Sequence, residues 1–421
     1  MKLSTRIMKS IQDLKRLAGI AATIAVAVAT VSCGSSKDEP EGPTNEHTVI
    51  VYMAACNSLG SGGYDRQDLI EMQEAVANNT LHGQVLVYRG DIDGNAKLYR
   101  MTAEGPKPLR DYASDGLSSV HSERMINVLK DARTLAPARS YGLVLWSHGN
   151  GWLQTGIEDN NNEFQPTAWG EDRGRVMNIT TLRRVLEQVG TWAYIYFDCC
   201  FMASVEVVYE LRNTAPYIIG SATELLLTGM PYEKNIPCLF EYADGGLVRA
   251  ATNTFNYYND MTTPKDRTCT ISVVSTAALD DVAAACRDIL VTGKGKLPDG
   301  FRQQPFMVGS RCWFYDLGHY YDGLCQYIAE DVARPEGQGT QLKAALGAAL
   351  NRAVIYAAAT PRLWNRISLE YHCGLSTYPP ENAAAASVKN YNTLTWYSDV
   401  SQHAFSTKTD TTRPRHDSRG I

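Results

Sequence analysis

Two kinds of apolar pattern alternate along the chain. The stretch TVIVYMAAC (48–56) is a continuous apolar run rich in β-branched residues, which is typical of a strand buried on both faces. In YDRQDLIEMQEAVAN (64–78) the apolar residues recur instead at helical spacing. This alternation predicts an α/β fold, a mostly parallel sheet with helices on both faces. Within 141–151 we expect a strand that breaks into a Gly-rich loop. Further strands are expected at 84–92, with a hairpin partner at 96–102, and at 192–198, 216–223, 268–276 and 373–380. Further helices are expected at 122–134, capped by Ser122, and at 180–189, 203–213 and 278–293.

Polar residues whose side chains could take part in catalysis follow two of these strands. The strand that begins at 141 leads into Ser147, His148 and Gly149, and the strand 192–198 leads into Cys199 and Cys200. In open α/β sheets the working groups lie beyond the carboxyl ends of the strands, so neighbouring strands would bring an imidazole and a thiol together. A nearby imidazole or helix amino terminus helps a thiol to ionise and become a nucleophile. A structural histidine and a buried core cysteine are the alternatives.

Composition narrows the function classes. Lys and Arg total 40 against 45 Asp and Glu, and the basic residues are spread along the chain, so nothing favours a nucleic-acid partner. The ten cysteines show no CxxC pair or His/Cys cluster with zinc-site spacing, so no structural metal is expected. Most of these cysteines are expected to be buried thiols. A serine hydrolase is disfavoured because no GxSxG motif occurs.

The two polar strand ends carry a family resemblance. VLWSHGNGW (144–152) and YFDCCFMASVEVVYEL (196–211) resemble the two active-site motifs of the clostripain-like cysteine peptidases, and weaker similarity extends over residues 48–400. The resemblance implies a caspase-like sheet, with Cys200 as nucleophile and His148 as general acid/base. It also implies that the backbone N–H groups of Gly149 and Cys200 stabilise the oxyanion. Cys199 then stands where relatives commonly carry a small residue.

Asp198 has two interpretations. In relatives an aspartate at this place helps to form an acidic pocket for Arg or Lys before the scissile bond. The alternative is that Asp198 caps the following helix. Whether the enzyme prefers Arg or Lys before the scissile bond stays open. Relatives often carry a second acid downstream of the cysteine, but this chain has Leu226, Leu227 and Thr228 in that region, with only Glu224 and Glu233 nearby. Cys56 also replaces a residue that is commonly aspartate in relatives.

The segment between the two motifs is long and polar. Many clostripain-like enzymes are cut in this segment during activation, and here it contains Arg173 and Arg175. An ordinary surface loop is the alternative. Its acids Glu158 and Asp159 could bind calcium, as in some relatives, although EF-hand spacing is absent. No other cofactor is expected.

The amino terminus predicts export. Basic residues precede an apolar run from Leu17 to Val31, which at about 15 residues is short for a spanning helix. The end resembles a bacterial lipoprotein signal, in which Cys33 becomes the lipidated first residue and the polar stretch after it a tether. Thr30 stands where such signals usually carry leucine, and plain secretion or an uncleaved membrane anchor are the alternatives.

These observations divide the chain into five expected segments and leave two functions. Either the protein is an exported cysteine endopeptidase, lipid-anchored at the outer membrane or cell surface and acting on protein or peptide substrates, or it is a catalytically inactive surface binding lipoprotein on the same scaffold. The segments are a signal at 1–33, a polar linker at 34–47, a caspase-like catalytic core at 48–240, the C-terminal part of the peptidase domain at 241–406, and a polar tail at 407–421.

Overall fold

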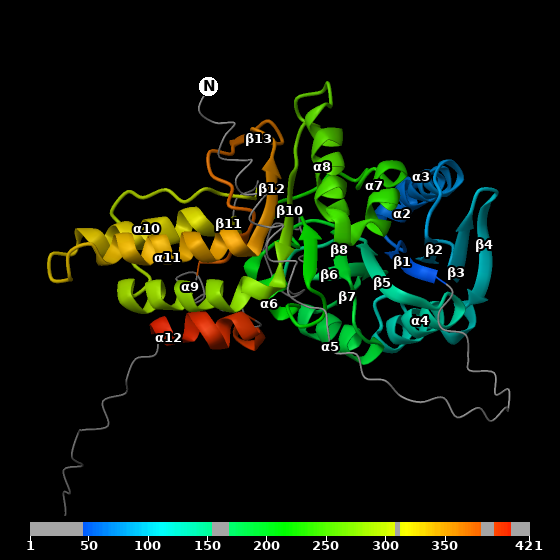
Figure 1. Ribbon diagram of the computed structural model, residues 1–421, viewed down its shortest axis with the longest axis horizontal. Coiled ribbons are helices and arrows are strands. Elements are labelled where there is room, and N and C mark those ends of the chain that lie inside the picture. The colour runs from blue at the N-terminus through cyan, green and yellow to red at the C-terminus, as the bar shows by residue number, and fades with distance from the viewer. Residues whose placement is uncertain (1–44, 154–167, 308–311, 380–390, 406–421) are drawn as a thin grey trace, which may run out of the picture. The chain divides into compact units, whose positions relative to one another are not determined.

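A nine-stranded sheet forms the centre of the fold (Figure 1). The computed structural model describes residues 45–153, 168–307, 312–379 and 391–405. The strands lie in the spatial order β12 (Val354–Ala359), β10 (Thr270–Ser275), β9 (Tyr217–Gly220), β8 (Tyr194–Asp198), β5 (Ala138–Trp146), β1 (Asn45–Ala54), β2 (Gly83–Gly90), β3 (Ala96–Thr102) and β4 (Gly105–Asp111).

Strand direction confirms the expected mostly parallel sheet. The five central strands, β9, β8, β5, β1 and β2, pair in parallel, while β10 and β12 at one edge and β3 and β4 at the other are added by antiparallel pairing. The segment 96–102 is the hairpin partner of β2, as predicted. Since β10 and β12 belong to the same sheet, the C-terminal part of the chain extends the core that the N-terminal part begins.

Alternation along the central strands gives the sheet two buried faces. In β1, Ile50 and Tyr52 belong to one apolar cluster, while Val49 and Val51 belong to the other. These side chains are fully buried, and each such burial is worth about 1.5–3 kcal/mol relative to exposure. Helices therefore cover both faces, as the sequence predicted.

The helices divide between these clusters as follows. The cluster of Val49 and Val51 includes residues of α3 (Tyr64–Asn78), α7 (Tyr232–Phe240) and α8 (Gly246–Asn259). The cluster of Ile50 and Tyr52 includes α4 (Ser122–Leu135), α5 (Ile179–Val189), α6 (Val205–Glu210), α9 (Leu279–Gly293), α10 (Leu317–Glu330) and α11 (Gln338–Ala353). The short elements are α2 (Ser58–Gly62), β6 (Trp169–Asp172), β7 (Arg175–Met177), β11 (Tyr315–Asp316), β13 (Arg362–Leu363), β14 (Ile367–Ser368), β15 (Ser376–Thr377) and α12 (Gln402–Phe405).

Several local predictions need correction. The N-cap of α4 is His121, whose Nδ1 accepts the Glu123 N–H at 3.3 Å, so Ser122 is already helical. Strand β1 begins at Asn45, inside the expected linker, because its first residues pair with β5. Among the described residues 373–379 of an expected strand, only Ser376–Thr377 form one, β15.

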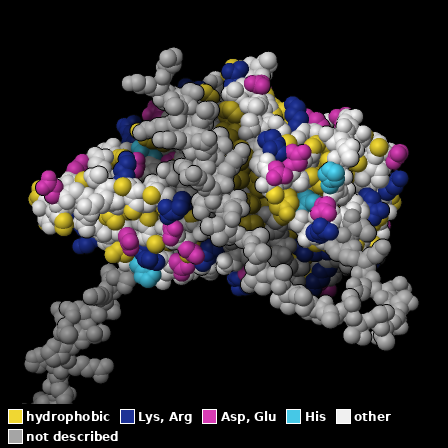
Figure 2. Space-filling model, in the orientation of Figure 1, with side chains coloured by type: hydrophobic (Ala, Val, Ile, Leu, Met, Phe, Trp, Pro, Cys, Tyr) yellow, Lys and Arg dark blue, Asp and Glu magenta, His cyan; other side chains and the backbone are white. Residues whose placement is uncertain are grey.

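The surface and the helices bear on possible partners. On the face drawn in Figure 2, Lys and Arg side chains are interspersed with Asp and Glu side chains. Among the described residues no helix is both long and apolar enough to cross a membrane. The expected signal, with Cys33, lies outside the described residues.

Candidate active site

The loops that carry His148 and Cys200 lie side by side. Strands β5 and β8 pair in parallel, with Trp146 opposite Asp198, and each loop residue comes two positions after its strand ends. A Cβ placed on Gly149 would come within 2.7 Å of the Cys200 carbonyl oxygen. The two sequence motifs are therefore in direct backbone contact at the carboxyl edge of the sheet.

The two adjacent cysteines have different surroundings. Cys199 is only 4% exposed, and its Sγ donates to the Leu145 carbonyl at 3.5 Å. Cys200 is half-buried, and its Sγ accepts the Leu225 N–H at 3.3 Å. The next residue, Phe201, has φ of 62°, a conformation that is unusual for a residue with a side chain. Of these two cysteines, Cys200 is the more exposed.

Burial keeps both candidate catalytic groups uncharged. It raises the pKa of Cys200 to about 12, with the Leu225 N–H opposing that shift and the Glu224 and Asp198 carboxylates adding to it. Burial also lowers the pKa of His148, opposed by the charge of Glu171. At neutral pH the thiol is therefore protonated and the imidazole neutral.

Two residues that the sequence analysis missed contact the His148 ring. Nε2 lies 2.8 Å from the Ser58 Oγ and 3.9 Å from a Glu171 carboxylate oxygen. Within the described part of the chain, no hydrogen bond joins His148 to Cys200. Ser58 carried a usable signal, because it is polar and follows β1 at the same edge of the sheet. Glu171 carried none, since β6 was not predicted.

The N–H groups expected to stabilise the oxyanion belong to the two contacting loops. Within the described residues, the backbone N–H groups of Gly149 and Cys200 donate to no carbonyl of another residue. By contrast, their neighbours Asn150 and Phe201 donate to Ala168 and Thr223. The contact between residue 149 and the Cys200 carbonyl brings the two loops that carry these N–H groups together.

Asp198 does not cap the following helix. Ser204 caps α6 by accepting the Val207 N–H. The buried Asp198 carboxylate instead uses Oδ2 to accept the Met230 N–H at 3.3 Å and the Tyr232 hydroxyl at 3.0 Å. Burial raises its pKa to about 6, against these two hydrogen bonds.

A second acid that the sequence analysis missed lies near Asp198. Asp68 of α3 accepts the Trp146 indole N–H at 2.6 Å. Its pKa is raised to about 9 by burial and by the charges of Asp198 and Glu71. The signal was present, because Asp65 and Asp68 share the buried stripe of α3 with Met72 and Ala75.

Glu224 and Glu71, two further acids, are engaged by other residues. Glu224 accepts the Trp364 indole N–H at 2.5 Å, and burial raises its pKa. The pKa of Glu71 is raised to about 7 by burial, and its carboxylate accepts the Tyr232 N–H at 3.1 Å. Thr228, in the region where the sequence analysis looked for a second acid, has its hydroxyl 3.4 Å from the Tyr258 hydroxyl.

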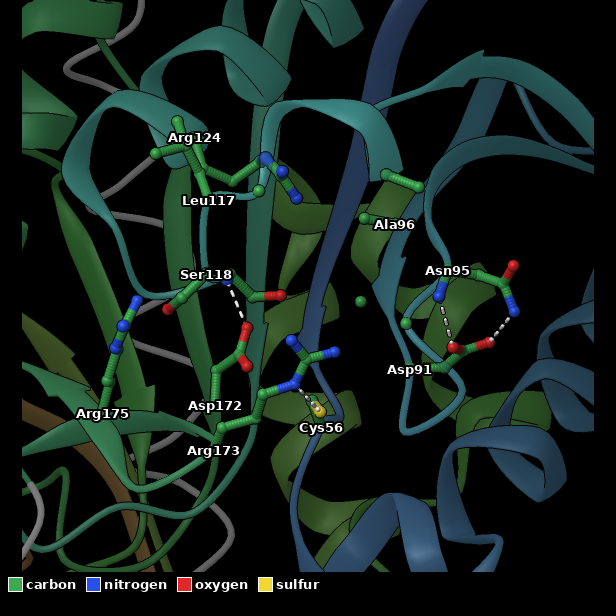
Figure 3. A pocket seen from close by; sticks show the side chains of 15 residues that line it. Cys56, Asp91, Asn95, Ala96, Leu117, Ser118, Arg124, Asp172, Arg173 and Arg175 are labelled. Carbon is green, nitrogen blue, oxygen red and sulfur yellow. Dashed lines mark hydrogen bonds between the residues drawn. The ribbon is translucent and has the colours of Figure 1, made fainter.

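Cys56 lines a separate cavity of about 220 Å³, shown in Figure 3. The Arg173 Nε donates to its Sγ at 3.2 Å, and the Arg173 N–H donates to its carbonyl. Burial raises the pKa of this thiol, which Arg173 opposes. Arg173 and Gly174 form the turn between β6 and β7, and Arg175 begins β7, so both arginines lie in a hairpin.

The sequence left open a calcium site and predicted mostly buried, free thiols. Glu158 and Asp159 lie outside the described residues. Within the ranges that the structure describes, no group of three or more His, Cys, Asp or Glu side chains could hold a metal ion. The nine cysteines of those ranges are free, and five of them, including Cys199 and Cys56, are buried.

An α/β sheet that places a cysteine and a histidine on adjacent loops has the groups that a cysteine peptidase requires. The chain belongs to the clostripain family, whose model matches residues 51–410. It is therefore a clostripain-like cysteine peptidase.

Solved structures support the same family. An inactive zymogen C11 protease from Parabacteroides distasonis is 29% identical, with a TM-score of 0.69 over 85% of this chain and 98% of that one. A secreted C11 cysteine protease from Bacteroides thetaiotaomicron, in complex with an irreversible peptide inhibitor, is 29% identical, with a TM-score of 0.67 over 84% and 99%. A second secreted protease from that organism, "iotapain", at 22% identity and a TM-score of 0.69 over 84% and 99%, shares the fold. A search among curated proteins found no match.

Proposed function

We propose that the protein is an exported endopeptidase in which Cys200 is the nucleophile and His148 the general acid/base. The observation that carries this proposal is the in-register placement of the two residues, each two positions beyond paired parallel strands. Catalysis starts from an uncharged pair. The thiol proton passes to the imidazole as sulfur attacks the peptide carbonyl, because the thiolate and not the thiol is the nucleophile.

The remaining steps follow from the same groups. The N–H groups of Gly149 and Cys200 stabilise the negative oxygen of the tetrahedral intermediate. The imidazolium then returns its proton to the leaving amine, which breaks the C–N bond and leaves a thioester on Cys200. Water attacks this thioester with His148 as the base, which releases the acid product and restores the thiol.

Asp198 is proposed to select Arg or Lys before the scissile bond. Its Oδ2 is occupied by Met230 and Tyr232, while its Oδ1 has no hydrogen bond among the described residues. A buried carboxylate oxygen of this kind pairs strongly with a cation. A Cβ at position 229 would come within 2.7 Å of Asp198 Oδ2, so glycine at this position leaves that side of the carboxylate uncovered.

Export and activation complete the proposal. Cleavage of the signal before Cys33, lipidation of that cysteine and a polar tether would hold the enzyme at the cell envelope, with plain secretion as the alternative. The secreted relatives from Bacteroides thetaiotaomicron favour export. Cleavage at Arg173 or Arg175, between the two motifs, is the proposed activation step.

Two cysteine substitutions test the nucleophile. Cys200→Ala should abolish turnover of peptide substrates, while the matched neighbour Cys199→Ala should keep most of it. A peptide electrophile that reacts with thiols should label wild type and Cys199→Ala at Cys200 alone. Unchanged turnover in Cys200→Ala would disprove the assignment. A native protein that neither hydrolyses peptides nor takes the label would instead be the inactive binding lipoprotein.

A further inference from the structure

The His148 ring is held from the side opposite to the nucleophile. In the order of the sheet, β1 and β8 flank β5, so the loop after β1 and the loop of Cys200 lie on opposite sides of His148. Ser58, in the loop after β1, lies 2.8 Å from Nε2. A Glu171 carboxylate oxygen lies 3.9 Å from the same nitrogen.

We propose that Ser58 and Glu171 are positioning residues that keep a proton on Nε2 of His148, so that Nδ1 is the nitrogen that exchanges a proton with Cys200. This inference rests on the proposed function, in which His148 is the general acid/base. It supplies the orienting group that the sequence motifs lack. Neither residue touches the substrate in this assignment, and both act through the imidazole.

The electrostatics select this tautomer. A serine hydroxyl can donate or accept, so the contact with Ser58 alone fits either tautomer. An ionised carboxylate only accepts, and its charge favours a hydrogen on the nearest ring nitrogen. The Nε2–H therefore donates to the Ser58 Oγ, and Nδ1 keeps its lone pair. When Nδ1 takes the thiol proton, Glu171 stabilises the imidazolium that forms.

A buried hydrogen-bond hub fixes both residues. The Ser147 Oγ donates to the Ala54 carbonyl at 2.8 Å and accepts the Glu171 N–H at 3.0 Å and the Asn57 side-chain amide at 3.2 Å. This one hydroxyl thus ties the ends of β1 and β5 to β6. Ser147 is only 3% exposed, so the hub is shielded from water.

Asn57 sets the position of Ser58 directly. Its side-chain oxygen accepts the Leu59 N–H at 2.9 Å and so caps α2, in which Ser58 is the first residue. Its side-chain amide also donates to the Glu171 carbonyl at 2.9 Å. The same side chain therefore fixes the backbone of both residues that contact His148. Such supporting contacts hold a catalytic ring within the tolerance that proton transfer requires.

Kinetics with matched variants provide the first test. Ser58→Ala should lower kcat about 10- to 100-fold with KM changed less than about twofold, since general acid/base catalysis is worth up to about 10⁴-fold. Ser58→Thr keeps the hydroxyl and should restore most of the rate. Ser61→Ala removes an exposed hydroxyl of the same helix, which bonds to the Asn57 carbonyl, and should leave kcat unchanged. A Ser58→Ala variant with wild-type kcat would overturn the proposal.

Nitrogen NMR of the His148 ring provides a test that needs no turnover. In a Cys200→Ala background the ring should carry its proton on Nε2, and Ser58→Ala should shift the population towards Nδ1–H. Glu171→Gln should lower the pKa of His148, because the charge of Glu171 raises it. A proton on Nδ1 in the Cys200→Ala protein would overturn the proposal. Full turnover in His148→Ala would instead reject His148 as the general acid/base. The NMR result does not depend on that assignment, so the two proposals can fail separately.

Discussion

Gly149 and Cys200 are in contact through their backbones, 51 residues apart along the chain. A Cβ at position 149 would lie 2.7 Å from the Cys200 carbonyl oxygen and 3.0 Å from the Cys199 Cβ. Real Cβ atoms do not approach backbone oxygens so closely, so only glycine fits without a shift of the nucleophile loop. The glycine after the histidine is thus a requirement of the contact between the two motifs.

Gly149→Ala should therefore impair catalysis by displacing the nucleophile. We expect the labelling of Cys200 by a peptide electrophile to slow at least about tenfold, with a loss of about 1–3 kcal/mol in the free energy of unfolding. Gly347→Ala is the matched control, because no atom lies within 4 Å of its added Cβ. That helical substitution should leave labelling unchanged and stabilise the protein by up to about 1 kcal/mol. Equal labelling rates for Gly149→Ala and wild type would contradict the contact.

Asp198 should make the preference for basic residues depend on pH. Its pKa is about 6, so the carboxyl is neutral below that pH and carries the charge that pairs with a cation above it. The ratio of kcat/KM for an arginine substrate over a citrulline substrate should therefore rise between about pH 5 and pH 7. In Asp198→Asn this rise should disappear. Use of the ratio cancels the titration of His148 and Cys200. If the arginine-to-citrulline ratio of kcat/KM in the wild type did not change with pH, Asp198 would not determine the preference for basic residues.

Asp68 should make stability fall as pH rises. Its folded pKa of about 9 lies above the unfolded value of about 4, so between these values the folded state holds a proton that the unfolded state has released. The unfolding free energy of wild type should then fall by up to about 1.4 kcal/mol per pH unit relative to Asp68→Asn. Urea unfolding at pH 5 and pH 8 measures this difference. Glu74→Gln, on the exposed face of the same helix, should show no such trend. If the free energies of unfolding of wild type and Asp68→Asn differed by the same amount at pH 5 and pH 8, the raised pKa of Asp68 would be refuted.

The sequence predicted best where pattern and packing agree. Helix α3 has the bounds that its apolar spacing indicates, and β5 and β8 end where polar residues interrupt apolar runs. Adjacent strand ends then brought His148 and Cys200 to one edge of the sheet. The prediction worked because buried parallel strands carry a strong local signal.

Elements defined by distant pairing were missed. Strand β12 follows α11 directly in an alanine-rich stretch, and it is a strand because it pairs with β10 about 80 residues earlier. Helix α7 contains Pro237, which a pattern-based prediction treats as a stop. Glu171 was missed because, as for β12, its position depends on pairing between segments: the hairpin of β6 and β7 places it beside His148. Local patterns do not encode which segments meet.

Activating cleavage between the motifs has few available positions if the enzyme cuts after basic residues. Residues 154–167 contain no Lys or Arg, and the basic residues between His148 and Cys200 are Arg173, Arg175, Arg183 and Arg184. The last two lie in α5, where Arg183 pairs with Glu187 and with Glu210. A protease binds its substrate in an extended form, so the hairpin arginines are easier to reach than helical ones.

Purified wild type should therefore convert to two chains cut after Arg173 or Arg175, while Cys200→Ala stays intact. The double variant Arg173→Gln, Arg175→Gln should also stay intact, and its peptide turnover should remain at the uncut level. Arg184→Gln is the control and should be processed normally. Mass spectrometry of the new termini locates the cut. A new terminus within 154–167 would contradict the prediction and the basic preference with it, because no basic residue precedes any bond there.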